Sequence, residues 1–252
     1  MKTLNIGTWN IKNSYFDTGL NDLKVTAIID LLESEYLNIL GLQEVNPLLA
    51  SKLEEKLAER CNGYKITTSY KKSINPINNL RVEYNMIISN IPFYKDKKMK
   101  LVSDTKTGNK RNIKPRNLTS QTFIAGNDEI VFNNTCLESN NMALNLLQCK
   151  QVYWKMLGDI QDDINVQSIL VGNLNVFRDS VLMEDEYLNY FDNLGLKVID
   201  NPNRTYKFHS LNQPIDYIIV PKEYEVISVN CPDYYTKKVS THNPVFTKVK
   251  VK

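Results

Sequence analysis

The chain has 252 residues, of which 42% are hydrophobic and 23% are charged, and its formal net charge is +3. This length fits one large domain or two small ones, and the composition predicts a packed core. The balance of 31 basic and 28 acidic residues is too even to indicate nucleic-acid binding by charge alone, and no apolar run approaches the roughly 18 residues that a membrane-spanning helix needs.

The cysteine pattern and the first residues bear on the cellular compartment. The four cysteines are widely spaced, at Cys61, Cys136, Cys149 and Cys231. No pair has the spacing of a zinc site or a redox motif, and a disulfide framework is not expected at this chain length. The N-terminus passes directly into strand-like alternation instead of a signal peptide. We therefore expect a reduced, intracellular and cytoplasmic protein.

The first third of the chain alternates strands with two amphipathic helices. In order, we expect a strand at Leu4–Trp9, a helix at Asn21–Glu35, a strand at Leu37–Leu42, a helix from Pro47 to about Gly63, and strands at Tyr64–Tyr70 and Tyr84–Ser89. Apolar residues three and four positions apart identify the helices. Asn46 supplies the cap of the second helix and Pro47 its first residue.

Two polar segments are expected to be loops, and a basic run overlaps the second. Lys71–Leu80 separates two of the predicted strands, and Ser103–Pro115 is the longest loop candidate. Basic residues cluster between Lys95 and Arg116, and such a run is more often a solvated loop than a binding surface.

The remaining chain continues the same alternation. In order, we expect strands at Leu118–Ile124 and Glu129–Thr135, a helix at Asn141–Ile160, a strand at Gln167–Val171, a helix at Asp185–Leu194, and strands at Ile215–Val220, Glu225–Asn230 and Val245–Val251. The apolar run Ile169–Val171 suits a central strand. Gly172 marks a point where the backbone turns or closely approaches another group. No Gly- or Pro-rich linker divides the chain, so we predict one α/β domain over residues 1–252.

Polar side chains stand at the ends of the predicted strands. They are Asn10, Gln43 with Glu44, Cys136, Asn173 with Asn175, Asp216 and His242. Taken singly, each has an ordinary explanation: a glutamate there is usually solvated, a lone histidine is more often structural, and asparagines are common in turns. Six such positions, each beside an apolar run, indicate one converging site, because ligands of α/β folds sit at the carboxyl ends of strands.

Six short motifs resemble, in order and spacing, the endonuclease/exonuclease/phosphatase superfamily of deoxyribonuclease-like, Mg²⁺-dependent phosphodiesterases. They are Thr8–Asn10, Leu42–Val45, Asn134–Leu137, Gly172–Asn175, Ile215–Ile218 and Ser240–Val245. The set spans the whole chain, and Cys136–Ser139 and Asn175–Asp179 look closest to the tyrosyl-DNA phosphodiesterase 2 branch. The resemblance implies a four-layer α/β sandwich of two mostly antiparallel β-sheets flanked by helices.

The resemblance also implies a metal site and a catalytic pair. Glu44 would be the main carboxylate for Mg²⁺ or Mn²⁺, with Asn10 beside it. Asn175 would hold the attacking water or a phosphate oxygen. His242 would be the general base or a phosphate-contacting imidazole, oriented by Asp216.

Three further roles follow from the same resemblance. Glu83 sits where the family orients its other histidine. Arg116 matches a phosphate-contacting arginine. Tyr206 stands where related enzymes often carry an aromatic residue, although a surface loop is the more ordinary interpretation of this segment.

Three departures from the family pattern fall on the chemistry. The family has aspartate where Asn173 and Thr241 stand, and histidine where Cys136 stands. Only Glu44 of the acidic set then remains charged, so binding of Mg²⁺, a hard cation held by carboxylates and water, is expected to be weak. A thiol is a poor hydrogen-bond donor, and losing one well-aimed donor typically costs roughly 100- to 1,000-fold in turnover.

Three hypotheses follow. The first is a degenerate, inactive member that binds nucleic acid, another phosphodiester ligand or a protein partner through the old groove, with the basic run as its rim. The second is an active Mg²⁺-dependent phosphodiesterase, nuclease or phosphatase in which Asn173 and Asn175 coordinate through amide oxygens and His242 is the base. The third is a Cys136–His242 nucleophile pair, against which stands an inert, buried cysteine.

Overall fold

The computed structural model describes residues 2–12, 19–60, 63–68, 83–102, 116–162, 165–178, 180–181, 183–201, 205, 214–233 and 239–252. The strands are β1 (Thr3–Asn10), β2 (Ile39–Val45), β3 (Lys65–Thr68), β4 (Tyr84–Ser89), β5 (Phe93–Lys100), β6 (Asn117–Ala125), β7 (Asp128–Cys136), β8 (Val166–Asn173), β9 (Leu196–Val198), β10 (Asp216–Pro221), β11 (Glu225–Asn230) and β12 (Val245–Lys250). The α-helices are α1 (Asn21–Ser34), α2 (Pro47–Arg60), α3 (Met142–Asp162) and α4 (Leu188–Asn193), the last preceded by a π-helical turn at Met183–Tyr187.

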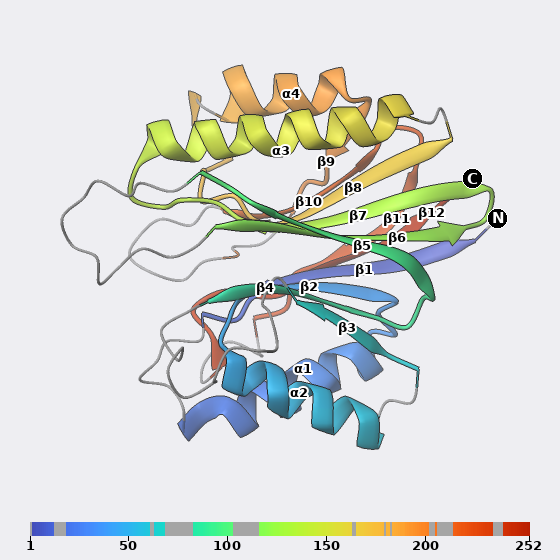
Figure 1. The fold of residues 1–252 in the computed structure, drawn as a ribbon, viewed down its shortest axis with the longest axis vertical. Coiled ribbons are helices and arrows are strands. Elements are labelled where there is room, and N and C mark those ends of the chain that lie inside the picture. The colour runs from blue at the N-terminus through green and yellow to red at the C-terminus, as the bar shows by residue number, and fades with distance from the viewer. Residues whose placement is uncertain are drawn as a thin grey trace.

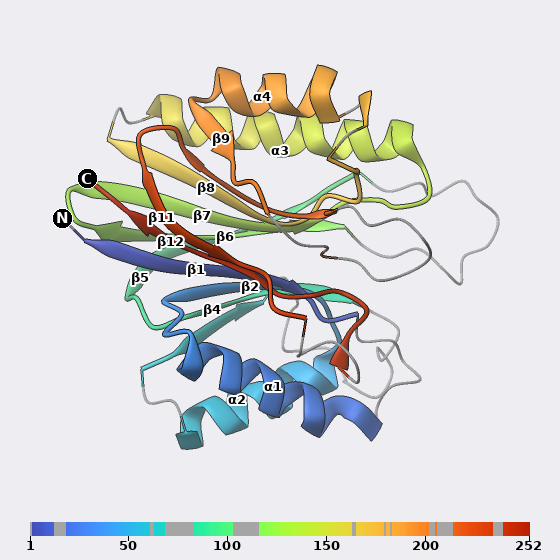
Figure 2. The same cartoon turned by 180° about the vertical axis from the view of Figure 1, so that it is seen from behind.

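The elements form four layers (Figure 1). Sheet A has the strand order β11-β12-β1-β2-β4-β3, and sheet B has the order β5-β6-β7-β8-β10-β9. Helices α1 and α2 cover the outer side of sheet A, and α3 and α4 cover that of sheet B, while the two ends of the chain lie side by side (Figures 1 and 2). The predicted sandwich of two mostly antiparallel sheets flanked by helices is therefore confirmed.

Three apolar layers hold these elements together. Helices α1 and α2 pack on sheet A, the two sheets pack on each other, and α3 and α4 pack on sheet B. Strand β8 shows why its sequence reads as a continuous apolar run. Ile169 and Val171 point into the layer between the sheets, whereas Leu170 points into the layer under α3. A strand buried on both faces needs apolar residues at every position.

A parallel strand pair lies at the centre of each otherwise antiparallel sheet. Strand β1 runs parallel to β2, and β7 runs parallel to β8. The registers place Asn10 beside Gln43 and Cys136 beside Asn173. The two central pairs also face each other, since β1 contacts β8 and β2 contacts β7. Four strand carboxyl ends with polar residues therefore meet at one end of the sandwich.

Most predicted elements are present, but the basic run was assigned wrongly. Residues Lys95 to Lys100 are not a loop, since they belong to β5, which pairs with β6 at the edge of sheet B. An edge strand leaves lysine side chains in water, so the charge pattern of a strand and a loop can be the same. The short β9 was also not anticipated. The expected loops at 71–80 and 103–115 lie outside the described residues.

Three of the cysteines, Cys136, Cys149 and Cys231, are free and buried, and Cys61 lies outside the described residues. Among the helices that the structure describes, none combines the length and hydropathy that crossing a membrane requires.

A buried amide bridge joins the two sheets behind the meeting strand ends. Asn134 of β7 donates from Nδ2 to the carbonyls of Leu42 (2.9 Å) and Met86 (2.8 Å) in sheet A. Its Oδ1 accepts from Gln43 Nε2 at 2.8 Å, and Gln43 also donates to Thr8 Oγ1 at 2.9 Å. All of these side chains are inaccessible to water. The bridge therefore contributes to how one sheet is positioned on the other.

Replacing Asn134 with leucine should lower the free energy of unfolding by about 3 kcal/mol, because it leaves two carbonyls and the Gln43 amide buried with fewer partners. Urea unfolding should show a lower midpoint at an unchanged slope. The exposed Asn140 provides a matched control, and Asn140→Leu should change stability by less than about 0.5 kcal/mol. Equal stabilities of the two variants would contradict the proposed role of the bridge.

Candidate active site

The strand ends bring most of the predicted site residues into one cluster. These are Asn10 at the end of β1, Glu44 in β2, Arg116 just before β6, Cys136 at the end of β7, Asn173 at the end of β8, Asp216 at the start of β10, and His242 shortly before β12. We call this set the strand-end cluster. Tyr206 lies outside the described residues, so its predicted role stays a prediction.

Glu44 faces an amide nitrogen. Asn10 Nδ2 donates to Glu44 Oε1 at 3.2 Å, while Asn10 Oδ1 accepts from the backbone N–H of Lys12 at 2.9 Å. Cys136 Sγ lies 4.0 Å from the same Glu44 oxygen. Asn10 therefore presents a hydrogen-bond donor to Glu44 and turns its oxygen toward the backbone.

Asp216 and His242 form a buried pair. His242 Nδ1 lies 2.8 Å from Asp216 Oδ2, and both side chains are almost completely buried. Asn173 Nδ2 donates to the other oxygen, Asp216 Oδ1, at 2.7 Å, and lies 3.5 Å from His242 Nδ1. Asn173 Oδ1 lies 4.0 Å from Cys136 Sγ. One carboxamide thus lies between Cys136 on one side and the Asp216–His242 pair on the other, so it separates the two residues of the nucleophile-pair hypothesis, Cys136 and His242.

Side chains from distant segments hold the Asp216–His242 pair in place. Thr205 Oγ1 accepts from the backbone N–H groups of Ile215 (2.9 Å) and Asp216 (3.1 Å). The backbone carbonyl of His242 accepts from Trp9 Nε1 at 2.9 Å, and its N–H donates to Ser240 Oγ at 3.1 Å. Sequence reasoning missed the roles of Thr205 and Ser240, because nothing in the sequence distinguishes a hydroxyl that accepts from these backbone N–H groups from any other loop serine or threonine.

The backbone adopts left-handed conformations at the cluster. Glu44 has φ of 55° and Asn175 has φ of 54°. Asn175 Nδ2 donates to the Leu137 carbonyl at 2.8 Å. Gly172 has φ of 143°, and a Cβ atom there would lie 1.9 Å from the Thr135 carbonyl oxygen. The predicted close backbone approach at Gly172 is therefore present, and it is what lets β8 deliver Asn173 to the cluster.

Arg116 is the cation of the cluster. Its side chain is 5% exposed, its Nη1 donates to Cys136 Sγ at 3.0 Å, and its Nε lies 3.8 Å from Glu138 Oε2. Burial by itself lowers the pKa of Arg116, but Cys136, Glu44, Glu138 and Glu83 together raise the pKa above its ordinary value. Arg116 is therefore held charged among three carboxylates, one of which, Glu138, had no predicted role.

The donor set does not fit Mg²⁺ or Mn²⁺. These hard cations require several oxygen ligands, with carboxylates prominent among them. Within the described part of the chain, no group of three or more His, Cys, Asp or Glu side chains could hold a metal ion. Glu44 is the carboxylate that Asn10 contacts among the described residues, and the side-chain oxygen of Asn10 accepts from the backbone N–H of Lys12. The guanidinium of Arg116 acts on the same carboxylate and would repel a cation there.

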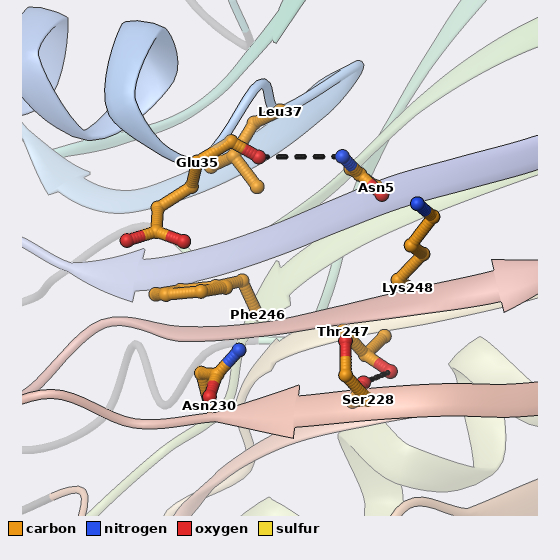
Figure 3. Close-up of a pocket in the computed structure, with 8 residues that line it drawn as sticks. All are labelled: Asn5, Glu35, Leu37, Ser228, Asn230, Phe246, Thr247 and Lys248. Carbon is orange, nitrogen blue, oxygen red and sulfur yellow. Dashed lines mark hydrogen bonds between the residues drawn. The ribbon is translucent and has the colours of Figure 1, made fainter.

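A separate pocket lies elsewhere in sheet A (Figure 3). It has a volume of about 150 Å³ and is lined by Asn5, Glu35, Leu37, Ser228, Asn230, Phe246, Thr247 and Lys248. Asn5 Nδ2 donates to the Glu35 carbonyl at 3.3 Å at its upper edge. None of the predicted site residues lines this pocket, so it is distinct from the strand-end cluster.

Comparison with solved structures places the fold. A mannosyl-6-phosphatase from Bacteroides thetaiotaomicron is 16% identical, with a TM-score of 0.77 over 98% of this chain and 100% of the other. An endonuclease/exonuclease/phosphatase from Bacteroides vulgatus is 17% identical, with a TM-score of 0.77 and 100% of both chains covered. A humanized D. rerio TDP2 is 14% identical, with a TM-score of 0.70 over 99% of each chain.

These similarities define the class of fold. The chain has the endonuclease/exonuclease/phosphatase, or deoxyribonuclease-like, fold over its whole length, as its strand-end motifs predicted. By sequence, it matches no protein-family model and no curated protein. At identities of 14 to 17%, the similarity establishes the fold, and the chemistry has to be argued from the residues of the cluster.

The strained backbone at Glu44 gives a stability prediction. At an ordinary strand position glycine is less stable than alanine, but at φ of 55° an L side chain is disfavoured. Glu44→Gly should therefore have a free energy of unfolding about 1 kcal/mol higher than Glu44→Ala, measured by urea unfolding. Both variants lose the Asn10 contact, so their difference isolates the backbone term.

The same pair of substitutions at Val131, which lies within β7 at an ordinary strand position, serves as the control. There the alanine variant should be the more stable of the two. If alanine is also the more stable variant at position 44, the backbone there is not strained.

Proposed function

We propose that this chain is a non-hydrolytic protein of the deoxyribonuclease-like fold, which binds nucleic acid or another phosphate-bearing ligand at the strand-end cluster. The observation that carries this proposal is the position of Asn173. Its Nδ2 donates to Asp216 Oδ1 at 2.7 Å, so the carboxamide acts as a donor where the family pattern has a carboxylate. A second carboxylate beside Glu44 is therefore lost, and with it the negative charge that would hold a catalytic divalent cation.

Cleavage of a phosphodiester develops negative charge that the site has to stabilise. The strand-end cluster lacks a full set of groups for this, so we expect it not to hydrolyse phosphodiesters. A metal ion in such a site polarises the phosphoryl oxygen and lowers the pKa of the attacking water. Positioned donors supply the rest of the stabilisation. Cys136 brings a thiol, which is a weak donor and cannot carry positive charge. Within the described part of the chain, Arg116 is the strong donor that we expect to face the phosphate, and one such donor without an activated water does not support efficient cleavage.

Retention of binding is supported by what the cluster preserves. The Asp216–His242 pair is buried and held by Thr205, Trp9 and Ser240. The left-handed backbone at Glu44 and Asn175 costs stability, and such conformations are characteristic of functional sites. One similar structure is a mannosyl-6-phosphatase, and another is D. rerio TDP2 in complex with a single-strand DNA product. Phosphate-bearing ligands are therefore the class that we expect here.

An active, rearranged hydrolase is the alternative function, and one observation favours it. Asn173 and Asn175 both direct their N–H groups at protein acceptors, Asp216 and the Leu137 carbonyl. Their amide oxygens are then the groups left to coordinate a cation beside Glu44, with His242 as the base. Calorimetry with Mg²⁺ at physiological concentration distinguishes the two functions, because only the active enzyme requires binding.

The decisive test is a cleavage assay with DNA, RNA, 5′-tyrosyl and phosphoinositide substrates in the presence of Mg²⁺ or Mn²⁺. The unmodified chain should cleave none of them. The triple variant Cys136→His, Asn173→Asp, Thr241→Asp restores the donor and both carboxylates, and should cleave at least one substrate by 100-fold or more above the unmodified chain, on the order of one restored donor.

Adding Glu44→Ala to the triple variant serves as the control, since it should abolish the restored activity and so locate it in the strand-end cluster. Metal-dependent cleavage by the unmodified chain that Glu44→Ala removes would overturn the proposal and establish the active alternative.

A further inference from the structure

We infer that the strand-end cluster binds the phosphate group of its ligand without a divalent cation, and that Arg116 provides the positive charge that a metal ion would otherwise bring. This inference rests on the proposed function, because it specifies how the same site compensates the negative charge of its ligand. It starts from the mismatch between the donor set and Mg²⁺. A phosphate needs a compensating cation, and Arg116 is the cation that the cluster itself contains.

Arg116 is preorganised for such a role. The side chain is 5% exposed, and its guanidinium is held by Cys136 Sγ at 3.0 Å and by Glu138 Oε2 at 3.8 Å. Little side-chain freedom is then left to lose when a ligand binds. The Nε–H is buried and makes no hydrogen bond within the described part of the chain. A guanidinium presents a planar fork of donors that matches phosphate oxygens.

The thiol at position 136 allows Arg116 to exchange its present partner for a phosphate. Sulfur is a weak hydrogen-bond acceptor, whereas a phosphate oxygen is a strong and charged one. Arg116 therefore gains by exchanging its contact with Cys136 Sγ for a contact with phosphate. An imidazole at this position would occupy more space and would itself be a donor, competing with Arg116 for the same oxygens. With cysteine instead of histidine at position 136, Arg116 becomes the residue that contacts the phosphate.

The charge of Glu44 affects phosphate affinity in opposite directions in a metal-dependent site and in a metal-independent site. In a metal-dependent site its carboxylate attracts the cation, so removing its charge weakens phosphate binding. In a metal-independent site the same carboxylate faces Asn10 and acts on Arg116, and its charge repels the phosphate. Glu44→Gln keeps the shape of the side chain and removes only the charge. The direction of its effect on phosphate affinity therefore distinguishes the two sites.

The experiment is a ³¹P NMR titration of inorganic phosphate with the full chain, once in EDTA and once in Mg²⁺. The unmodified chain should bind equally well in both, within about twofold. Glu44→Gln should tighten binding in EDTA by about fivefold, the size expected for a unit charge a few ångströms away at partial exposure. Arg116→Gln should weaken it by about tenfold or more, as for the loss of a hydrogen bond to a charged group.

Lys248→Gln is the matched control, because it removes a positive charge from the separate pocket and should leave phosphate affinity unchanged. Since Arg116 is buried, its variant is compared only if its unfolding midpoint shows a folded protein, and the Glu44→Gln result stands without it. Binding that needs Mg²⁺ and is lost in Glu44→Gln would overturn this inference and leave the proposed binding function intact. Absence of binding in both conditions would overturn the proposed function as well.

Discussion

The arrangement of the whole molecule depends on two parallel strand pairs, β1–β2 and β7–β8, which lie at the middle of the two sheets and pack against each other. Parallel neighbours end at the same edge, so the polar residues that follow the apolar runs must meet there. The amide bridge from Asn134 to Gln43, Leu42 and Met86 contributes to how the two pairs oppose each other. Two further hydrogen bonds, from Asn85 to the Asn117 carbonyl and from Gln121 to Thr67, also join sheet A to sheet B.

The chemistry of the cluster depends on how its charges are distributed. Glu44, Glu83 and Glu138 raise the pKa of Arg116, and Glu138 lies 3.8 Å from its Nε, while Asp216 is engaged by His242 and Asn173. The carboxylates of the cluster therefore act on groups of the protein itself. The deoxyribonuclease-like fold is present together with a histidine held by an aspartate, while an amide and a hydroxyl stand at positions 173 and 241, where the family resemblance implies carboxylates.

Sequence reasoning located most strands, and the polar residues at their ends, because both depend on local order: an apolar run followed by a polar residue. The close backbone approach at Gly172 and the Asp216–His242 contact, which the family resemblance implied, are both present in the structure. Sequence reasoning did not find β5, since lysines are equally acceptable in an edge strand and a loop. It also missed Thr205 and Glu138, because their importance lies in partners distant along the chain or buried by tertiary packing, which no local pattern encodes.

If the strand-end cluster does not form a site for a divalent cation, Mn²⁺ should not bind there. The most direct measurement is a titration of Mn²⁺ into the unmodified chain, monitored through the electron paramagnetic resonance signal of the free ion. The same titration is repeated with the Asn173→Asp, Thr241→Asp variant. The account predicts that the unmodified chain leaves the signal as it is in buffer, while the variant reduces it. A reduction by the unmodified chain that Glu44→Gln abolishes would contradict the account.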